Sequence, residues 1–247
     1  MEKEEFIVYY QVQVDATSGK QTGVEALVRW QHPVMGLVSA VKFIDLAEET
    51  GLIVEIDRWV MNSAMTQVSK WYQEGLEPGV LALNLSMRQL RSHDFIKIIQ
   101  ENMKAIDFEP EWLEFEITEG QVMEKPEEAI IKLQQISDMG INIVIDDFGT
   151  GYSSLTYLKR LPVNKIKIDQ SFIKEVPYDS EDVSIVKAII ALAKSLRLDI
   201  VAEGVEKEAQ KEFLLENDCN HMQGYYYCEP LPADEIEEEY FKIDNKK

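Results

Sequence analysis

Two adjacent aspartates, Asp146 and Asp147, are the residues of this chain best suited to chemistry. They end an alternating apolar run and precede the glycine-rich loop FGTGYSS. Consecutive strand side chains point to opposite faces of a sheet, so we expect the two carboxylates to share an ion only where the strand ends and the backbone turns. Their hard oxygens suit Mg²⁺, Mn²⁺ or Ca²⁺, which would relieve their mutual repulsion. Taken alone, the pair is more typical of a solvated turn capped by aspartates.

The elements that would position these aspartates follow a regular order. Apolar alternation predicts strands at 6–14, 22–30, 80–85, 112–117, 141–146, 163–168, 198–203 and, more weakly, 221–227. Helical spacing predicts helices at 40–50, 53–74, 94–105, 126–139, 153–160, 181–196, 206–216 and 233–241.

The link between the first two strands, residues 15–21, is too short for a parallel crossover, so this pair is predicted to be antiparallel. The later alternation of strand and helix indicates a parallel sheet. Eight strands in 247 residues favour an α/β fold, a TIM-like (β/α)₈ barrel with an antiparallel first strand, as a single domain over 1–247.

In such a barrel the functional residues gather at the carboxyl ends of the strands. The polar residues predicted there are Glu25, Asn84, Glu116, Asp146, Asp147, Lys167, Glu203 and Gln223. Strand parity turns Glu25 and Glu116 away from the outer helices and into the barrel mouth. Any one of these residues alone is more typical of a cap or a solvated ion pair, but their joint placement favours a site. Oxygen ligands in this number can hold two ions, an arrangement that serves phosphoryl chemistry.

Composition restricts the class of protein. The net charge of −20 argues against binding to a nucleic-acid polymer, and an anionic substrate would need metal ions to enter. The two cysteines, Cys219 and Cys228, lack zinc-ligand spacing and are expected to be free thiols in a reducing cytosol. No apolar stretch is long enough to enter a membrane directly. We therefore expect a cytoplasmic location, either alone or as the cytoplasmic domain of a larger, membrane-anchored protein.

Seven short motifs, in order along residues 10–231, carry a family resemblance. They are EALVRW (25–30), NLS (84–86), EITE (116–119), DDFGTGYSSL (146–155), KID (167–169), AEGVE (202–206) and QGY (223–225). On these motifs the chain resembles EAL domains, the family of cyclic di-GMP phosphodiesterases. The resemblance implies metal-dependent hydrolysis of cyclic di-GMP to linear 5′-pGpG, two Mg²⁺ or Mn²⁺ ions per site and a homodimer. Ca²⁺ is expected to inhibit, because its longer and irregular coordination would misplace the attacking water.

The resemblance also implies roles for individual residues. It implies a first metal held by Glu25, Asn84, Glu116 and Asp146, and a second held by Asp146, Asp147 and Glu203. The residues with implied catalytic roles are Glu25, Lys167, which would orient and activate the attacking water, Glu203, and Glu119, which would tether the loop 148–154. Substrate contacts are implied for Gln11, Arg29, Asp169 and Gln223. Val12 departs from the family pattern, which commonly has proline after Gln11, but no ligand is lost.

Two other functions are consistent with the sequence. One is a receptor or protein-interaction module of the same fold that binds cyclic di-GMP without hydrolysing it. The other is an aldolase that forms a Schiff base on Lys167. Neighbouring carboxylates should raise the pKa of Lys167, which is the wrong direction for an amine nucleophile.

Overall fold

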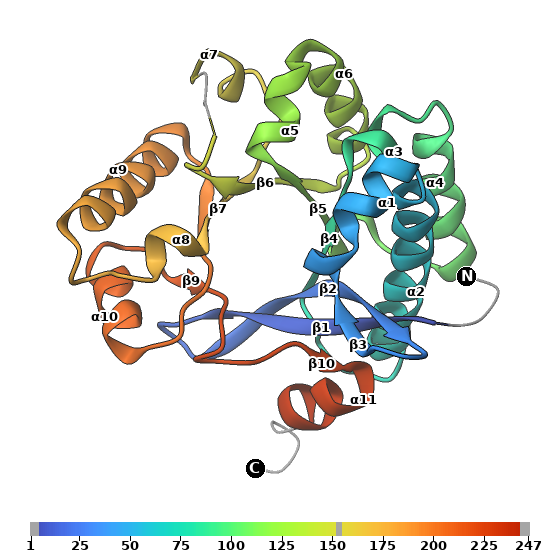
Figure 1. The fold of residues 1–247 in the computed structure, drawn as a ribbon, viewed down its shortest axis with the longest axis horizontal. Coiled ribbons are helices and arrows are strands. Elements are labelled where there is room, and N and C mark those ends of the chain that lie inside the picture. The colour runs from blue at the N-terminus through green and yellow to red at the C-terminus, as the bar shows by residue number, and fades with distance from the viewer. Residues whose placement is uncertain (1–4, 152–154, 243–247) are drawn as a thin grey trace.

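The computed structural model describes residues 5–151 and 155–242, and its strands close into a barrel surrounded by helices (Figure 1). The barrel strands are β1 (Phe6–Asp15), β2 (Lys20–His32), β4 (Val80–Asn84), β5 (Leu113–Thr118), β6 (Asn142–Phe148), β7 (Lys165–Ile168), β8 (Asp199–Ala202) and β9 (His221–Met222). Each pairs with the next in this order, and β9 closes the ring by pairing with β1. β1 is antiparallel to both of its neighbours and the other barrel pairs are parallel, which confirms the predicted barrel with an antiparallel first strand.

Helices cover the outside of the ring. They are α1 (Ile44–Thr50), α2 (Ile53–Gln73), α3 (Met87–Arg91), α4 (Phe95–Ile106), α5 (Glu119–Glu124), α6 (Pro126–Ser137), α7 (Leu155–Leu158), α8 (Gln170–Ile173), α9 (Ser180–Leu196), α10 (Glu208–Glu216) and α11 (Ala233–Ile236). Short 3₁₀ turns occupy Ala40–Lys42 and Pro110–Trp112, and a π-helical segment, Glu237–Phe241, follows α11. None of the helices in the described part of the chain is both long and apolar enough to cross a bilayer.

Several predicted boundaries were wrong. The strand predicted at 221–227 ends at Met222, and at Gly224 the chain packs against the Val205 backbone, where a Cβ would lie 2.2 Å from the carbonyl oxygen. The edge strands β3 (Gly36–Ser39) and β10 (Leu231–Pro232) and the helices α3, α5 and α8 were not predicted. All five are short, and so carry little periodicity. The helix predicted at 153–160 is described only from Leu155, since 152–154 lie outside the described residues, as does the tail 243–247.

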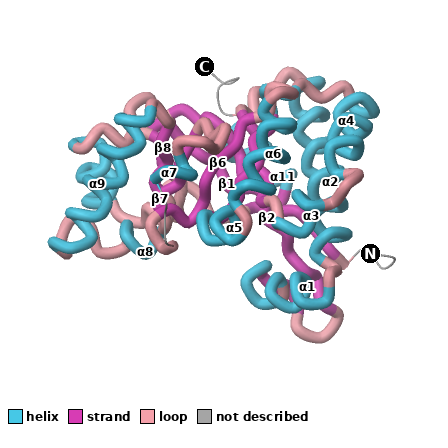
Figure 2. Tube along the Cα trace, turned by 90° about the horizontal axis from the view of Figure 1, so that it is seen from above, coloured by secondary structure: helices cyan, strands magenta, loops and turns pink. Residues whose placement is uncertain are grey.

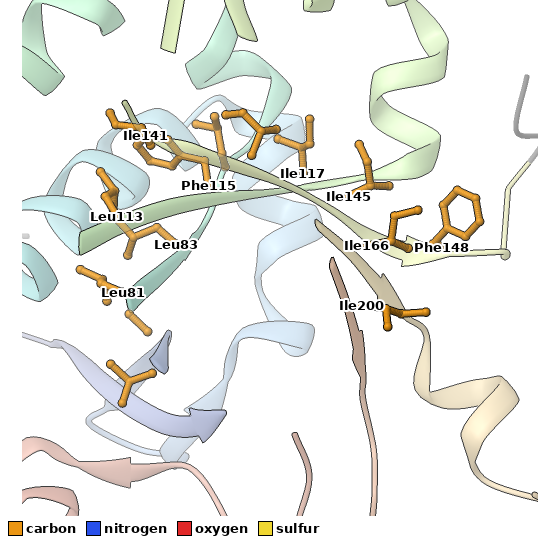
Figure 3. Packing of buried hydrophobic residues seen from close by; sticks show 14 of the residues in the cluster. Leu81, Leu83, Leu113, Phe115, Ile117, Ile141, Ile145, Phe148, Ile166 and Ile200 are labelled. Carbon is orange, nitrogen blue, oxygen red and sulfur yellow. The ribbon is translucent and has the colours of Figure 1, made fainter. Parts of the chain in front are cut away.

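Strand alternation gives the barrel an apolar outer face and an inner face that carries the buried charged residues. On β5, Leu113, Phe115 and Ile117 are buried against the helices (Figure 3). The residues between them, Glu114 and Glu116, belong to the opposite face, which lines the inside of the barrel. β7 repeats the pattern, with apolar isoleucines alternating with lysines. Burial of the apolar residues against the helices determines which face of each strand points outward, so the alternate residues point into the barrel.

A smaller, separate core lies beyond the main barrel. It consists of Val28, Val38, Phe43, Ala47, Ile53 and Ile56. These residues come from the extended end of β2, from β3, from α1 and the Phe43 that precedes it, and from the start of α2. Figure 2 shows α1 lying away from the ring of strands, in a projection that flanks the barrel.

The close approach of β2 and β4 predicts the effect of one substitution. Gly79, just before β4, and Gly75 both have a left-handed backbone, with φ of +73° and +78°. A Cβ on Gly79 would lie 2.2 Å from the Thr22 backbone oxygen, whereas a Cβ on Gly75 meets nothing within 4 Å. We expect Gly75→Ala to cost about 1 kcal/mol of unfolding free energy through backbone conformation alone. Gly79→Ala should cost about 2 kcal/mol more through overpacking, measured by urea denaturation. Equal losses in the two variants would contradict this account.

Candidate active site

The side chain of Lys167, fully buried on β7, lies at the centre of the polar barrel mouth. Its Nζ lies 2.5 Å from Glu203 Oε1 and 2.8 Å from Glu116 Oε1. It also lies 3.3 Å from Glu25 Oε2 and 3.7 Å from Asp146 Oδ1. Carboxylates from β2, β5, β6 and the end of β8 therefore converge on one ammonium. The structure brings these predicted site residues together.

Two amides hold Glu25 between them. Asn84 Nδ2 donates to Glu25 Oε1 at 2.7 Å, and Gln223 Nε2 donates to Glu25 Oε2 at 2.6 Å. Gln223 Nε2 also lies 3.0 Å from Gln11 Oε1, and Gln11 Nε2 donates to the Cys228 carbonyl at 2.8 Å. The backbone carbonyl of Cys228 thus fixes the orientation of Gln11 and, through it, that of Gln223.

A bulge in β6 lets two consecutive aspartates serve one site. The β6–β7 register is regular up to the pair Ile145 and Ile166, and then shifts before Phe148 pairs with Ile168. Within the shift Asp147 has a left-handed backbone with φ of 53°. The strand does not end at Asp146, as predicted, but runs to Phe148 through this irregularity. An extra residue in one strand redirects a side chain, and such bulges are common near active sites.

The donor set fits divalent cations. Asp146, Asp147 and Glu203, which the resemblance assigns to the second metal, each offer an oxygen within 4.8 Å of the others. Glu116 Oε2 is buried and has no hydrogen-bond partner within the part of the chain that the structure describes. A buried carboxylate oxygen without a donor is costly unless a cation meets it. Together with Glu25 and Asn84, Glu116 supplies oxygen ligands of the kind that Mg²⁺ and Mn²⁺ prefer.

Burial and the charges of neighbouring carboxylates determine the pKa shifts at the barrel mouth. Burial lowers the pKa of Lys167, but the surrounding carboxylates outweigh it and raise that pKa well above its usual value. Burial and neighbouring carboxylates raise the pKa of Glu203 to about 8 and that of Asp147 to about 6. Burial also acts to raise the pKa of Glu25, yet Lys167 and the donors from Gln223 and Asn84 lower it overall. Lys167 is therefore a charged donor, which is unsuited to Schiff-base chemistry.

Glu119, at the start of α5, holds the loop that follows β6. Its side chain is buried, and its Oε2 accepts from the Gly149 backbone N–H at 2.8 Å. A Cβ on Gly151 would lie 3.3 Å from the Glu119 carboxyl, so the loop passes close to this side chain. This contact agrees with the predicted tether. Residues 152–154 of this loop lie outside the described residues.

The predicted substrate contacts occupy different environments. Arg29 is half-buried, donates to the Val28 carbonyl at 3.0 Å and lies over the Tyr9 ring. Asp169 caps α8 by accepting from the Ser171 N–H at 3.0 Å, and its charge raises the pKa of Asp147. Gln11 and Gln223 are buried and bind protein groups, as described above. Substrate contact by these four residues remains a prediction.

Beside the carboxylates lies a cavity of about 420 Å³ that sequence reasoning missed. Asn84, Glu116 and Asp147 line one side, and apolar residues of the projection line the other. Asp57 of α2 also lines it, and burial raises the pKa of this carboxyl to about 6. Its Oδ2 accepts from Ser86 Oγ at 2.5 Å. The sequence did contain a signal for this cavity: Asp57 is a charged residue among the apolar positions of the helix predicted at 53–74.

Comparison with known proteins relates the chain to one family. The family model described as EAL domain matches residues 1–230. The chain is 44% identical over 236 residues to the bifunctional diguanylate cyclase/cyclic di-GMP phosphodiesterase MucR of Pseudomonas aeruginosa, covering 96% of this chain and 34% of that protein. It is 39% identical over 233 residues to the cyclic di-GMP phosphodiesterase PdeR of Escherichia coli, covering 94% and 35%. The chain thus spans about a third of the length of these relatives.

Solved structures share the fold. A structure described as PaMucR phosphodiesterase in complex with c-di-GMP is similar with a TM-score of 0.92 and 45% identity, covering 95% of each chain. The FimX EAL domain from Pseudomonas aeruginosa, bound to c-di-GMP, is similar with a TM-score of 0.85 and 25% identity, covering 93% of this chain and 92% of that one.

The Glu119 tether predicts a selective loss of metal affinity. Glu119→Ala removes the acceptor for the Gly149 N–H, so the loop after Asp147 should be held less firmly. We expect Mn²⁺ affinity, measured by calorimetry, to fall at least fivefold, which is about 1 kcal/mol. The unfolding free energy should fall by about 1 to 2 kcal/mol, the cost of losing a buried charged acceptor. Glu124→Ala, at the other end of α5, is the control; unchanged Mn²⁺ affinity in Glu119→Ala would rule out the tether.

Proposed function

This chain belongs to the EAL domain family, and from that premise we propose that it hydrolyses cyclic di-GMP to linear 5′-pGpG with two Mg²⁺ or Mn²⁺ ions, as a cytoplasmic homodimer. The observation that carries the proposal is the convergence of four carboxylates on Lys167, beside the three-carboxylate group formed by Asp146, Asp147 and Glu203. The relatives named cyclic di-GMP phosphodiesterases support the choice of substrate.

The metal ions would be held by the two predicted ligand sets, which share Asp146. When bound, such ions lower the pKa of water and neutralise charge on a phosphate. Mg²⁺ and Mn²⁺ suit the compact oxygen set, whereas Ca²⁺ would bind with longer and irregular coordination and inhibit.

Lys167 is the residue that would orient the nucleophile. Its ammonium stays charged among the carboxylates, so it can donate hydrogen bonds to a water or to a phosphate oxygen but cannot serve as a base near neutral pH. Burial and neighbouring carboxylates raise the pKa of Glu203 to about 8, and its carboxyl lies 2.5 Å from the Lys167 ammonium, so cation binding to Glu203 would release a proton. In the reaction a water oxygen bonds to phosphorus and one P–O3′ bond breaks. The water gives up one proton, the leaving 3′ oxygen takes one to become a hydroxyl, and the phosphate stays on the 5′ oxygen.

The 420 Å³ cavity supports this substrate class. Apolar walls suit the faces of a purine base, and the carboxylates of Asp45, Glu48 and Asp57 can accept from the N–H groups of a guanine edge. The cavity opens beside Asn84 and Glu116, so a base placed there would bring the adjoining phosphodiester toward the carboxylates.

A non-catalytic receptor of the same fold is the second candidate. The FimX EAL domain is described as bound to c-di-GMP, so binding without hydrolysis is a function to be distinguished from turnover. The two functions differ in turnover. A receptor would bind cyclic di-GMP in the presence of a chelator and leave it intact after Mg²⁺ or Mn²⁺ is added.

The product is the first test. Incubation with cyclic di-GMP and Mn²⁺ should give pGpG as the first product, identified by chromatography and mass spectrometry. The barrel mouth holds one cluster of carboxylates, which can act on one scissile phosphate at a time. Opening of the ring should therefore precede any second cleavage. GMP as the first product would contradict the proposal, and intact cyclic di-GMP would favour the receptor.

Two isosteric substitutions test the ligand assignment. Glu25→Gln and Asp147→Asn each remove a charge from the barrel mouth without removing an apolar contact. We expect each to lower kcat more than tenfold, a loss of at least 1.4 kcal/mol of transition-state stabilisation. Asp138→Asn, after α6 and remote from the mouth, is the matched control. If either site variant retained more than about a tenth of the parent kcat, its assigned role would be wrong.

A further inference from the structure

A second lysine–glutamate pair lies beneath the active site, inside the barrel. Lys165 Nζ of β7 lies 2.6 Å from Glu114 Oε2 of β5. The Glu114 side chain is 1% exposed and that of Lys165 is 18% exposed. Neither residue contacts the other carboxylates through an ion pair within the described residues, and the proposed function gives them no role.

The pair of Lys165 with Glu114, the lower pair, repeats the contact of Lys167 with Glu116 in the active site, the upper pair. Glu114 and Glu116 lie two residues apart on β5, and Lys165 and Lys167 lie two residues apart on β7. The upper pair, Lys167 with Glu116, spans the same two strands with a distance of 2.8 Å. Two residues along a strand correspond to about 7 Å, so the lower pair sits one interior layer below the upper one. Both pairs cross the intervening strand β6.

The ladder between β6 and β7 is irregular at the upper layer. Lys165 pairs in register with Val144 of β6, and the next row, Ile145 with Ile166, is also regular. The register then shifts at Asp146 and Asp147, beside Lys167. A bulge disrupts the hydrogen-bond ladder locally, so the ladder positions Lys167 against Glu116 less firmly than it positions the rows below.

We propose that the ion pair of Lys165 with Glu114 is a positioning pair that fixes the spacing of β5 and β7 just below the bulge, and thereby holds Glu116 and Lys167 in place for the metal ions. The inference rests on the proposed function for its catalytic consequence. A buried ion pair is seldom more stabilising than apolar residues of similar size, because both charges lose their hydration. The value of this pair therefore lies in its geometry.

The test is the apolar double variant Glu114→Leu/Lys165→Met. Lys165→Met alone would leave a buried, unpaired carboxylate and destabilise the fold, whereas the double variant removes both charges together. The control is Lys194→Met/Asp218→Leu, which removes a pair of the same charges with a 2.6 Å contact from the exposed surface. Lys165→Arg keeps the positive charge and should behave like the parent. If the apolar double variant does not fold, Glu114→Gln/Lys165→Gln takes its place with the same measurements.

The measurements separate positioning from stability. We expect the double variant to keep the parent's unfolding midpoint in urea, while its Mn²⁺ affinity by calorimetry and its kcat each fall at least fivefold. KM for cyclic di-GMP should change less than twofold, and the control should match the parent throughout. A folded double variant with Mn²⁺ affinity and kcat within twofold of the parent would overturn the inference. If the parent itself does not turn over, the proposed function fails, and Mn²⁺ affinity alone then decides whether the pair positions the site.

Discussion

The structure depends on the burial of one ammonium, that of Lys167, among four carboxylates. Removing these five ionisable groups from water is costly, and a single lysine cannot neutralise four acids. The remaining repulsion is visible in the pKa of Glu203, which burial and neighbouring acids raise to about 8. The barrel tolerates this because its outer face is apolar and supplies the stability of the fold. Every second strand position is thereby free to carry a group that the core would not accept.

The barrel alone would not bring Asp146 and Asp147 to the same place. Regular alternation sends one of two neighbours outward, and the bulge with its left-handed residue at Asp147 removes that constraint locally. The bulge brings a second carboxylate to the site, but it interrupts the regular backbone pairing of β6 with β7 there. Contacts from other elements compensate, among them the Glu119 carboxylate that accepts from the loop after the bulge. Side chains hold this region where the sheet does not.

The sequence predicted the barrel because apolar alternation and helical spacing are strong signals over long segments. It also predicted which strands carry the carboxylates, since parity follows from the apolar positions, although Glu25 lies within β2 and not at its carboxyl end. It could not predict the bulge, which depends on tertiary register and not on local pattern. The contact of Gln11 with the Cys228 carbonyl joins residues 217 positions apart and has no local signature. Short elements such as α8, held by the Asp169 cap, were missed for the same reason: four residues carry no period.

The amides beside Glu25 explain how the site stays receptive to cations. Asn84 and Gln223 donate to the two oxygens of Glu25, and with Lys167 they keep this carboxyl ionised despite its burial. Glu203 and Asp147 receive less compensation, so burial and neighbouring carboxylates raise their pKa values to about 8 and about 6. Protons and divalent cations therefore compete for the same oxygens, and ligand binding of this kind releases protons. Fixed donors keep Glu25 ionised, and the poorly compensated carboxylates beside it are the groups whose free energy a bound cation would lower most.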